Sequence, residues 1–114
     1  MSSRGAAALE LTEAVPVFAA LGDATRLRLL GRLSASGPLS ISRLSEGTGV
    51  TRQAITRHLH ALGGAGLVRN TRRGREQVWE LELKRLDDAK RYLDRIALQW
   101  DEAADRLKAF VEEP

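Results

Sequence analysis

A glycine-bounded turn joins two helical segments near the middle of the chain. Ser40 is suited to cap a short helix whose Ile41 and Leu44 face inward. Thr51 is suited to cap a longer helix, and the Gly-Thr-Gly sequence at 47–49 forms a tight turn between the two. Two helices joined by a short glycine-containing turn are typical of a helix-turn-helix unit.

The helix after Thr51 has two chemically different faces. At about 100° per residue, Ile55, Leu59 and Leu62 share an apolar face. The opposite arc carries side chains that can read base edges in the DNA major groove, and the adjoining turn and cap favour that role over a merely solvated face. These candidate DNA-binding residues are Arg52, Gln53, Thr56, Arg57 and His60.

A β-hairpin is predicted directly after this helix. Glycines at 63, 64 and 66 end the helix, and extended runs follow at 67–72 and 77–83. In the second run, tryptophan and leucine alternate with glutamate, which is the period of a half-buried strand. The predicted fold class is therefore mainly α with a small β-hairpin wing, a winged helix-turn-helix.

Positive charge is concentrated in the same region. Residues 51–75 contain six arginines and no acidic residue, whereas the 114-residue chain has a formal net charge of only +3. Such localised charge favours a surface that binds a phosphate polyanion. Arg72, Arg73 and Arg75 at the hairpin tip are predicted to contact phosphates or the minor groove of double-stranded DNA, with a solubilising loop as the alternative.

Two serines near the start of the short helix are further candidates for DNA binding. Ser40 and Ser42 could offer hydroxyl or backbone donors to a phosphate. Plain capping of the helix by Ser40 is the competing interpretation.

The last predicted helix, at about 85–112, has an apolar seam. Leucine or tryptophan recurs every seven residues from Leu86 to Leu107, and Ala89 to Phe110 follow the same period in the alternate phase. So small a domain cannot cover four heptads alone, and the seam therefore predicts a homodimer. The predicted interface residues are Leu86, Leu93, Ile96, Trp100, Leu107 and Phe110.

The expected domain organisation is a loose tail at 1–11 and one winged helix-turn-helix domain at 12–114 that includes the dimerisation helix. Thr12 and Asp23 are predicted to cap two scaffold helices at its start. The chain shows no internal repeat, linker or second domain.

Composition excludes several functional classes. Without cysteine the chain can form no disulfide, thiolate metal site or thiol redox sensor. No apolar run suits a membrane helix or a secretory signal, so a cytoplasmic protein is expected. No nucleophile with a base and no phosphate-cradling glycine loop is present, which favours a binding protein without catalytic residues or cofactor over an enzyme.

The two histidines do not suggest a metal site. His58 and His60 lie two residues apart on one helix and point about 200° apart, so they cannot chelate one ion together. His58 flanks the apolar face and is expected to pack or to form a hydrogen bond. No metal-binding residues are assigned.

The motifs FAALGDATRLRLL at 18–30, GVTRQAITRHL at 49–59 and AGLV at 65–68 are similar to those of the ArsR/SmtB family of bacterial winged-helix repressors. The resemblance implies a homodimer that binds a palindromic operator and releases it when an effector binds. It also implies that Arg52, Gln53, Thr56 and Arg57 face the major groove. Metal-sensing members use cysteines on the helix matching residues 40–46, or Asp, His and Glu on the last helix. This chain lacks the cysteines and has no histidine in its last helix, so metal sensing by either route is not expected.

The function predicted from the sequence is a sequence-specific, double-stranded DNA-binding transcriptional regulator, a homodimeric repressor that does not sense metal. Two alternatives stay open. One is a winged-helix protein-interaction module whose arginine hairpin docks on an acidic protein surface. The other is a regulator with a small-molecule pocket near the last helix, where Trp100 could line the site for an unknown effector.

Overall fold

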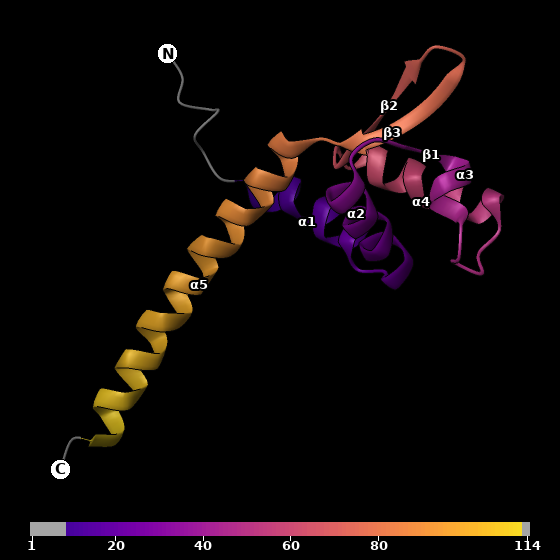
Figure 1. Cartoon of the computed structure of the whole chain (residues 1–114). Helices are drawn as coiled ribbons and strands as arrows, with labels where there is room; N and C mark the ends of the chain where they lie inside the picture. Colours follow the sequence, from indigo (N-terminus) through magenta and orange to yellow (C-terminus); the bar gives the residue numbers. More distant parts are fainter. Residues whose placement is uncertain (1–8, 113–114) are drawn as a thin grey trace, which may run out of the picture.

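The computed structural model describes residues 9–112, which form a winged helix-turn-helix fold (Figure 1). The elements within this range are α1 (Leu11–Leu21), α2 (Ala24–Ser36), β1 (Leu39–Ser40), α3 (Ile41–Ser45), α4 (Arg52–Gly64), β2 (Val68–Arg73), β3 (Glu76–Leu81) and α5 (Leu83–Glu112). The predicted class, mainly α with a β-hairpin wing, is confirmed. Within 9–112, no helix combines the length and apolarity that crossing a membrane requires.

Side-chain caps begin three helices where the sequence predicts them. Asp23 Oδ2 accepts a hydrogen bond from the backbone N–H of Arg26 at 3.1 Å. Ser40 Oγ accepts one from that of Arg43 at 3.3 Å, and Thr51 Oγ1 accepts one from that of Ala54 at 3.1 Å. The Arg26 hydrogen bond is also the main reason that the pKa of Asp23 lies below its ordinary value. Because each cap satisfies a donor that the helix leaves unpaired, these residues fix where α2, α3 and α4 begin.

The first helix begins earlier than predicted. The sequence suggests Thr12 as its cap, whereas α1 begins at Leu11 and its N-cap is Glu10. The backbone N–H of Glu10 donates to Glu13 Oε1 at 3.0 Å, and Leu9 is buried in the core. The buried Leu9 anchors the chain just before the helix, which the small and polar residues around it do not reveal. Residues 1–8 of the predicted tail lie outside the described residues.

A third strand accompanies the predicted hairpin. The antiparallel sheet has the order β1-β3-β2, and Leu39 of β1 and Asn70 of β2 both lie opposite Trp79 of β3. The two residues of β1 are too few to show an alternating pattern, so this strand is not predicted from the sequence. This strand joins α2 to α3 and thereby ties the helix-turn-helix to the base of the wing.

The core lies beneath α4, whereas most of α5 has no cover. The largest fully buried side chains are Leu29, Leu44, Ile55, Leu59, Leu62 and Leu67, so the predicted apolar face of α4 is confirmed. After its first turns α5 leaves the body and projects into solvent (Figure 1). Every described residue of α5 from 97 onward is exposed.

The turn after α4 depends on a glycine. Gly66 has φ +80°, and a Cβ at this position would lie 3.5 Å from Arg85 Nε. We expect Gly66→Ala to lower the free energy of unfolding by about 1–2 kcal/mol, because L-residues avoid this conformation. Gly64→Ala is the matched control, since Gly64 is helical and a Cβ there meets nothing within 4 Å. Urea denaturation measures both variants, and equal stabilities would contradict the argument.

Candidate nucleic-acid interface

The exposed face of α4 carries four of the predicted base-reading residues together. Arg52, Gln53 and Arg57 are exposed and Thr56 is half-buried, and the four line an open hollow of about 530 Å³. The Thr56 hydroxyl donates to the Arg52 carbonyl at 2.8 Å. Neither Arg52 nor Arg57 has an ion-pair partner among residues 9–112, so both guanidinium groups are available for a ligand.

Arg32 of α2 holds the helix-turn-helix in place. Its guanidinium donates to the backbone carbonyls of Leu44 at 2.8 Å, Arg43 at 2.8 Å and Glu46 at 3.0 Å. These carbonyls lie at the end of α3 and at its C-cap, Glu46, where a helix leaves acceptors that are not used by its own N–H groups. Sequence reasoning missed this residue, because nothing local to Arg32 indicates contacts with groups 11 to 14 positions away.

The two histidines of α4 have different neighbours. His58 Nδ1 accepts from Arg26 Nε at 3.2 Å and lies 3.8 Å from Asp23 Oδ2, which connects α4 to the start of α2. The expected hydrogen-bonding role of His58 is therefore confirmed. His60 lies edge-on against Trp79 of β3, with ring centroids 5.5 Å apart and an interplanar angle of 88°. This contact joins α4 to the wing, while His60 itself remains exposed.

The arginines of the wing fall into two groups. Arg69 Nε lies 3.1 Å from Glu80 Oε1, its NH1 lies 3.5 Å from Glu82 Oε2, and Arg73 NH2 lies 3.9 Å from Glu80 Oε2. Arg72 and Arg75 have no ion pair within the described residues. The surface formed by the six-arginine stretch thus carries less net positive charge than its sequence suggests, because β3 places carboxylates opposite Arg69 and Arg73.

Ser40 acts as a cap in this structure. Its Oγ accepts from the Arg43 backbone at 3.3 Å, and its backbone lies opposite Val78 in the sheet. Ser42 is exposed in the first turn of α3. A phosphate contact by either serine stays a prediction.

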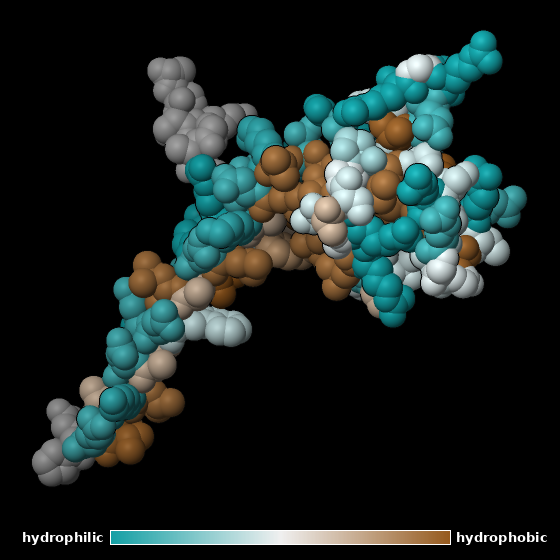
Figure 2. Space-filling model, in the orientation of Figure 1, coloured by the Kyte–Doolittle hydropathy of each residue, from teal (hydrophilic) through white to brown (hydrophobic). Residues whose placement is uncertain are grey.

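The seam of α5 is largely uncovered. Leu93, Trp100, Leu107 and Phe110 are 52%, 73%, 64% and 78% exposed, respectively. Of the other two predicted interface residues, Leu86 packs partly against the protein's own core and Ile96 is half-buried. Figure 2 shows hydrophobic residues at intervals along this projecting helix. On α1, Leu11 and Val15 add further exposed apolar side chains.

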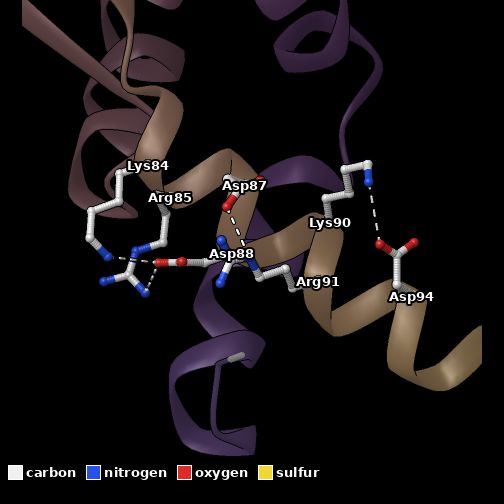
Figure 3. Close-up of polar contacts among 7 residues, drawn as sticks. All are labelled: Lys84, Arg85, Asp87, Asp88, Lys90, Arg91 and Asp94. Atoms are coloured by element: carbon white, nitrogen blue, oxygen red, sulfur yellow. Dashed lines mark hydrogen bonds and ion pairs between the residues drawn. The ribbon is translucent and has the colours of Figure 1, made fainter. Parts of the chain in front are cut away.

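Ion pairs hold the start of α5 (Figure 3). The buried carboxylate of Asp88 lies 3.4 Å from Lys84 Nζ and 3.8 Å from Arg85 NH1. Arg85 also packs over Gly66, at the turn that follows α4. Asp87 with Arg91 and Lys90 with Asp94 form i,i+4 pairs on the same segment. These ion pairs stabilise the first turns of α5 itself. Contacts with α1 set its direction, because the Tyr92 ring lies 5.6 Å from that of Phe18 and Arg95 NH2 donates to the Leu9 carbonyl at 3.1 Å.

Known proteins resemble this chain over most of the fold. A family model described as a helix-turn-helix domain matches residues 21–71. The HTH-type transcriptional regulator YuzN of Bacillus subtilis is 40% identical over 54% of this chain and 74% of its own length. The HTH-type transcriptional regulator Rv2034 of Mycobacterium tuberculosis is 37% identical over 67% of this chain and 70% of its own.

Solved structures extend the similarity to the last helix. An ArsR-like transcriptional regulator from Rhodococcus is 37% identical, with a TM-score of 0.76 over 90% of this chain and 96% of the other. The homodimeric winged helix-turn-helix DNA-binding domain of Mb0332 from Mycobacterium bovis, solved by NMR, is 27% identical. Its TM-score is 0.61 over 93% of each chain.

Proposed function

The chain belongs to the ArsR family of winged-helix transcriptional regulators, and on this premise we propose that it represses transcription as a homodimer bound to a palindromic operator. The observation that carries the proposal is the exposed face of α4. Arg52, Gln53, Thr56 and Arg57 lie side by side there, and no carboxylate of residues 9–112 lines the same hollow. These residue types hydrogen-bond base edges in the major groove.

Homodimerisation is supported by the uncovered seam of α5. A tryptophan that is 73% exposed in the single chain is unusual in a protein that stays monomeric, and exposed apolar side chains repeat along the same helix. The related domain from Mycobacterium bovis is a homodimer. A two-fold axis near α5 presents two copies of α4 to one duplex.

The mechanism of repression follows from this symmetry. Two recognition helices related by a two-fold axis read half-sites in successive major grooves, about 34 Å apart. Arg72 and Arg75 of each wing, which form no ion pair with the residues that the structure describes, contact the adjacent backbone or minor groove and add affinity without sequence information. Occupancy of the operator blocks RNA polymerase from the promoter.

Selection of bound duplexes from a random pool tests this function. We expect a motif with inverted symmetry, because each half-site is read by one α4 of the dimer. A selected motif without inverted symmetry would contradict the homodimeric arrangement. No enrichment above a control with an unrelated acidic protein would contradict DNA recognition itself.

We further propose that operator binding does not respond to metal ions. The chain has no cysteine, and its two histidines have separate partners, Arg26 and Trp79. Among residues 9–112, no three His, Asp or Glu side chains converge as metal ligands would. We expect stoichiometric, micromolar zinc to leave the affinity for the selected operator unchanged, as measured by fluorescence anisotropy. Release of DNA by zinc, with recovery on chelation, would reveal a site that forms only in the dimer.

A further inference from the structure

Glu80 of β3 neutralises two arginines of the wing. One of its carboxylate oxygens lies 3.1 Å from Arg69 Nε and the other lies 3.9 Å from Arg73 NH2. The Glu80 side chain is 19% exposed, whereas those of Arg69 and Arg73 are 58% and 62% exposed. The carboxylate is therefore the more buried member of each pair.

The Arg73 side chain points toward Glu80 and not toward the tip of the hairpin. Its neighbour across the hairpin is Glu76, at the tip, whereas Glu80 lies four residues farther along β3 and opposite Arg69. The Arg73 guanidinium is nevertheless near Glu80, so the side chain extends back along the hairpin, away from the tip. A side chain in this conformation does not present its charge where a wing meets the DNA backbone.

Arg72 lies on a different face of the hairpin from the paired arginines. Side chains alternate along a strand, so Arg69 and Arg73 share one face with Glu80 and Arg72 lies on the other. The face that carries Arg72 also carries Trp79, whose ring contacts His60 of α4. Arg72 is thus on the α4 side of the wing and has no ion pair within residues 9–112, while Arg69 and Arg73 are on the opposite side.

We propose that Glu80 withholds Arg69 and Arg73 from DNA phosphates and thereby raises the preference for operator over random DNA. The inference rests on the proposed function. Phosphate contacts carry no sequence information directly, so each additional arginine on the backbone strengthens random binding at least as much as specific binding. A carboxylate that occupies two arginines limits non-specific affinity and leaves the base-reading face of α4 unchanged.

The test compares Glu80→Gln with Glu76→Gln on a random-sequence duplex at several salt concentrations. Glu76 lies on the same face of β3 and is exposed, with no ion pair among the described residues. Both variants remove one negative charge, but only Glu80→Gln removes the carboxylate paired with Arg73 and one of the two carboxylates paired with Arg69, the other being Glu82. We expect Glu80→Gln to bind random DNA more tightly and to lose about threefold more affinity per new phosphate contact between 50 and 200 mM salt. We expect Glu76→Gln to change random binding much less.

Two outcomes would overturn the proposal. The first is an equal effect of the two variants, which would trace the change to net charge alone. The second is a full effect of Glu80→Gln in a chain that also carries Arg69→Gln and Arg73→Gln, since those substitutions remove the groups that Glu80 would release.

Single arginine variants test the proposal independently if Glu80→Gln folds poorly. We expect Arg73→Gln to weaken random binding less than Arg75→Gln, and the reverse order would overturn the proposal. Failure of the proposed function is distinguishable, because the parent protein would then retain neither random nor selected duplexes. A parent that binds operator, together with an inert Glu80→Gln that melts like the parent, would contradict only the role of Glu80.

Discussion

Replacing Trp100 with glutamate is expected to convert the protein into a folded monomer. Trp100 lies at the middle of the α5 seam and is 73% exposed in the single chain, so the substitution removes no contact that the monomer makes with its core. In a two-fold dimer the change occurs twice, and it replaces a large apolar contact by a buried, unpaired carboxylate. A central interfacial tryptophan contributes about 2 kcal/mol or more, so we expect the dimer dissociation constant to rise roughly a thousandfold.

Sedimentation velocity at micromolar concentration measures this effect, and circular dichroism checks that the variant stays helical. Leu98→Glu is the matched control, because Leu98 is also exposed on α5 but lies about 200° around the helix from Trp100. We expect Leu98→Glu to remain dimeric. A parent protein that sediments as a monomer, or equal dissociation by both variants, would contradict the assignment of the seam.

Loss of the dimer should also weaken operator binding. A monomer presents one α4 and one wing, so it makes half of the phosphate and base contacts. Operator affinity of Trp100→Glu should then approach that of the parent for an isolated half-site, and the two should show the same dependence on salt.

Local patterns explain what the sequence could predict. The caps at Ser40 and Thr51 and the periodicity of Ile55, Leu59 and Leu62 involve residues within a few positions of one another. Such signals define the length of α4 and the face that it exposes. The same periodicity places Arg52, Gln53, Thr56 and Arg57 on the face of α4 that points away from the core.

Contacts between distant residues explain what the sequence could not predict. The carbonyl acceptors of Arg32 and the carboxylate partner of Arg73 become neighbours only after the chain has folded. In the sequence, Arg69 and Arg73 stand in a stretch without acidic residues, and their partner Glu80 follows that stretch. Antiparallel pairing in the hairpin brings this glutamate back onto the same face.

Replacing Arg57 with alanine is expected to impair operator recognition more than general DNA binding. Arg57 projects from the middle of α4 with no ion-pair partner among residues 9–112, and an arginine at a base edge contributes about 1–3 kcal/mol of discrimination. We therefore expect roughly a 5- to 150-fold loss of affinity per half-site on the selected operator and a much smaller loss on random duplex. The ratio of operator to random affinity should fall accordingly.

Arg75→Ala provides the contrast, because Arg75 lies at the tip of the wing and has no ion pair in the described part of the chain. A phosphate contact releases a counterion whatever the sequence, so this variant should weaken operator and random duplexes to a similar degree. The slope of log affinity against log salt should also become shallower by about one per subunit. Anisotropy titrations of both variants on both duplexes, at three or more salt concentrations, separate the two roles.

If Arg57→Ala kept the operator-to-random ratio while Arg75→Ala abolished it, the wing would read the bases and α4 would bind the backbone. That result would contradict the recognition role of α4, because its exposed face would then serve only to position the protein on DNA.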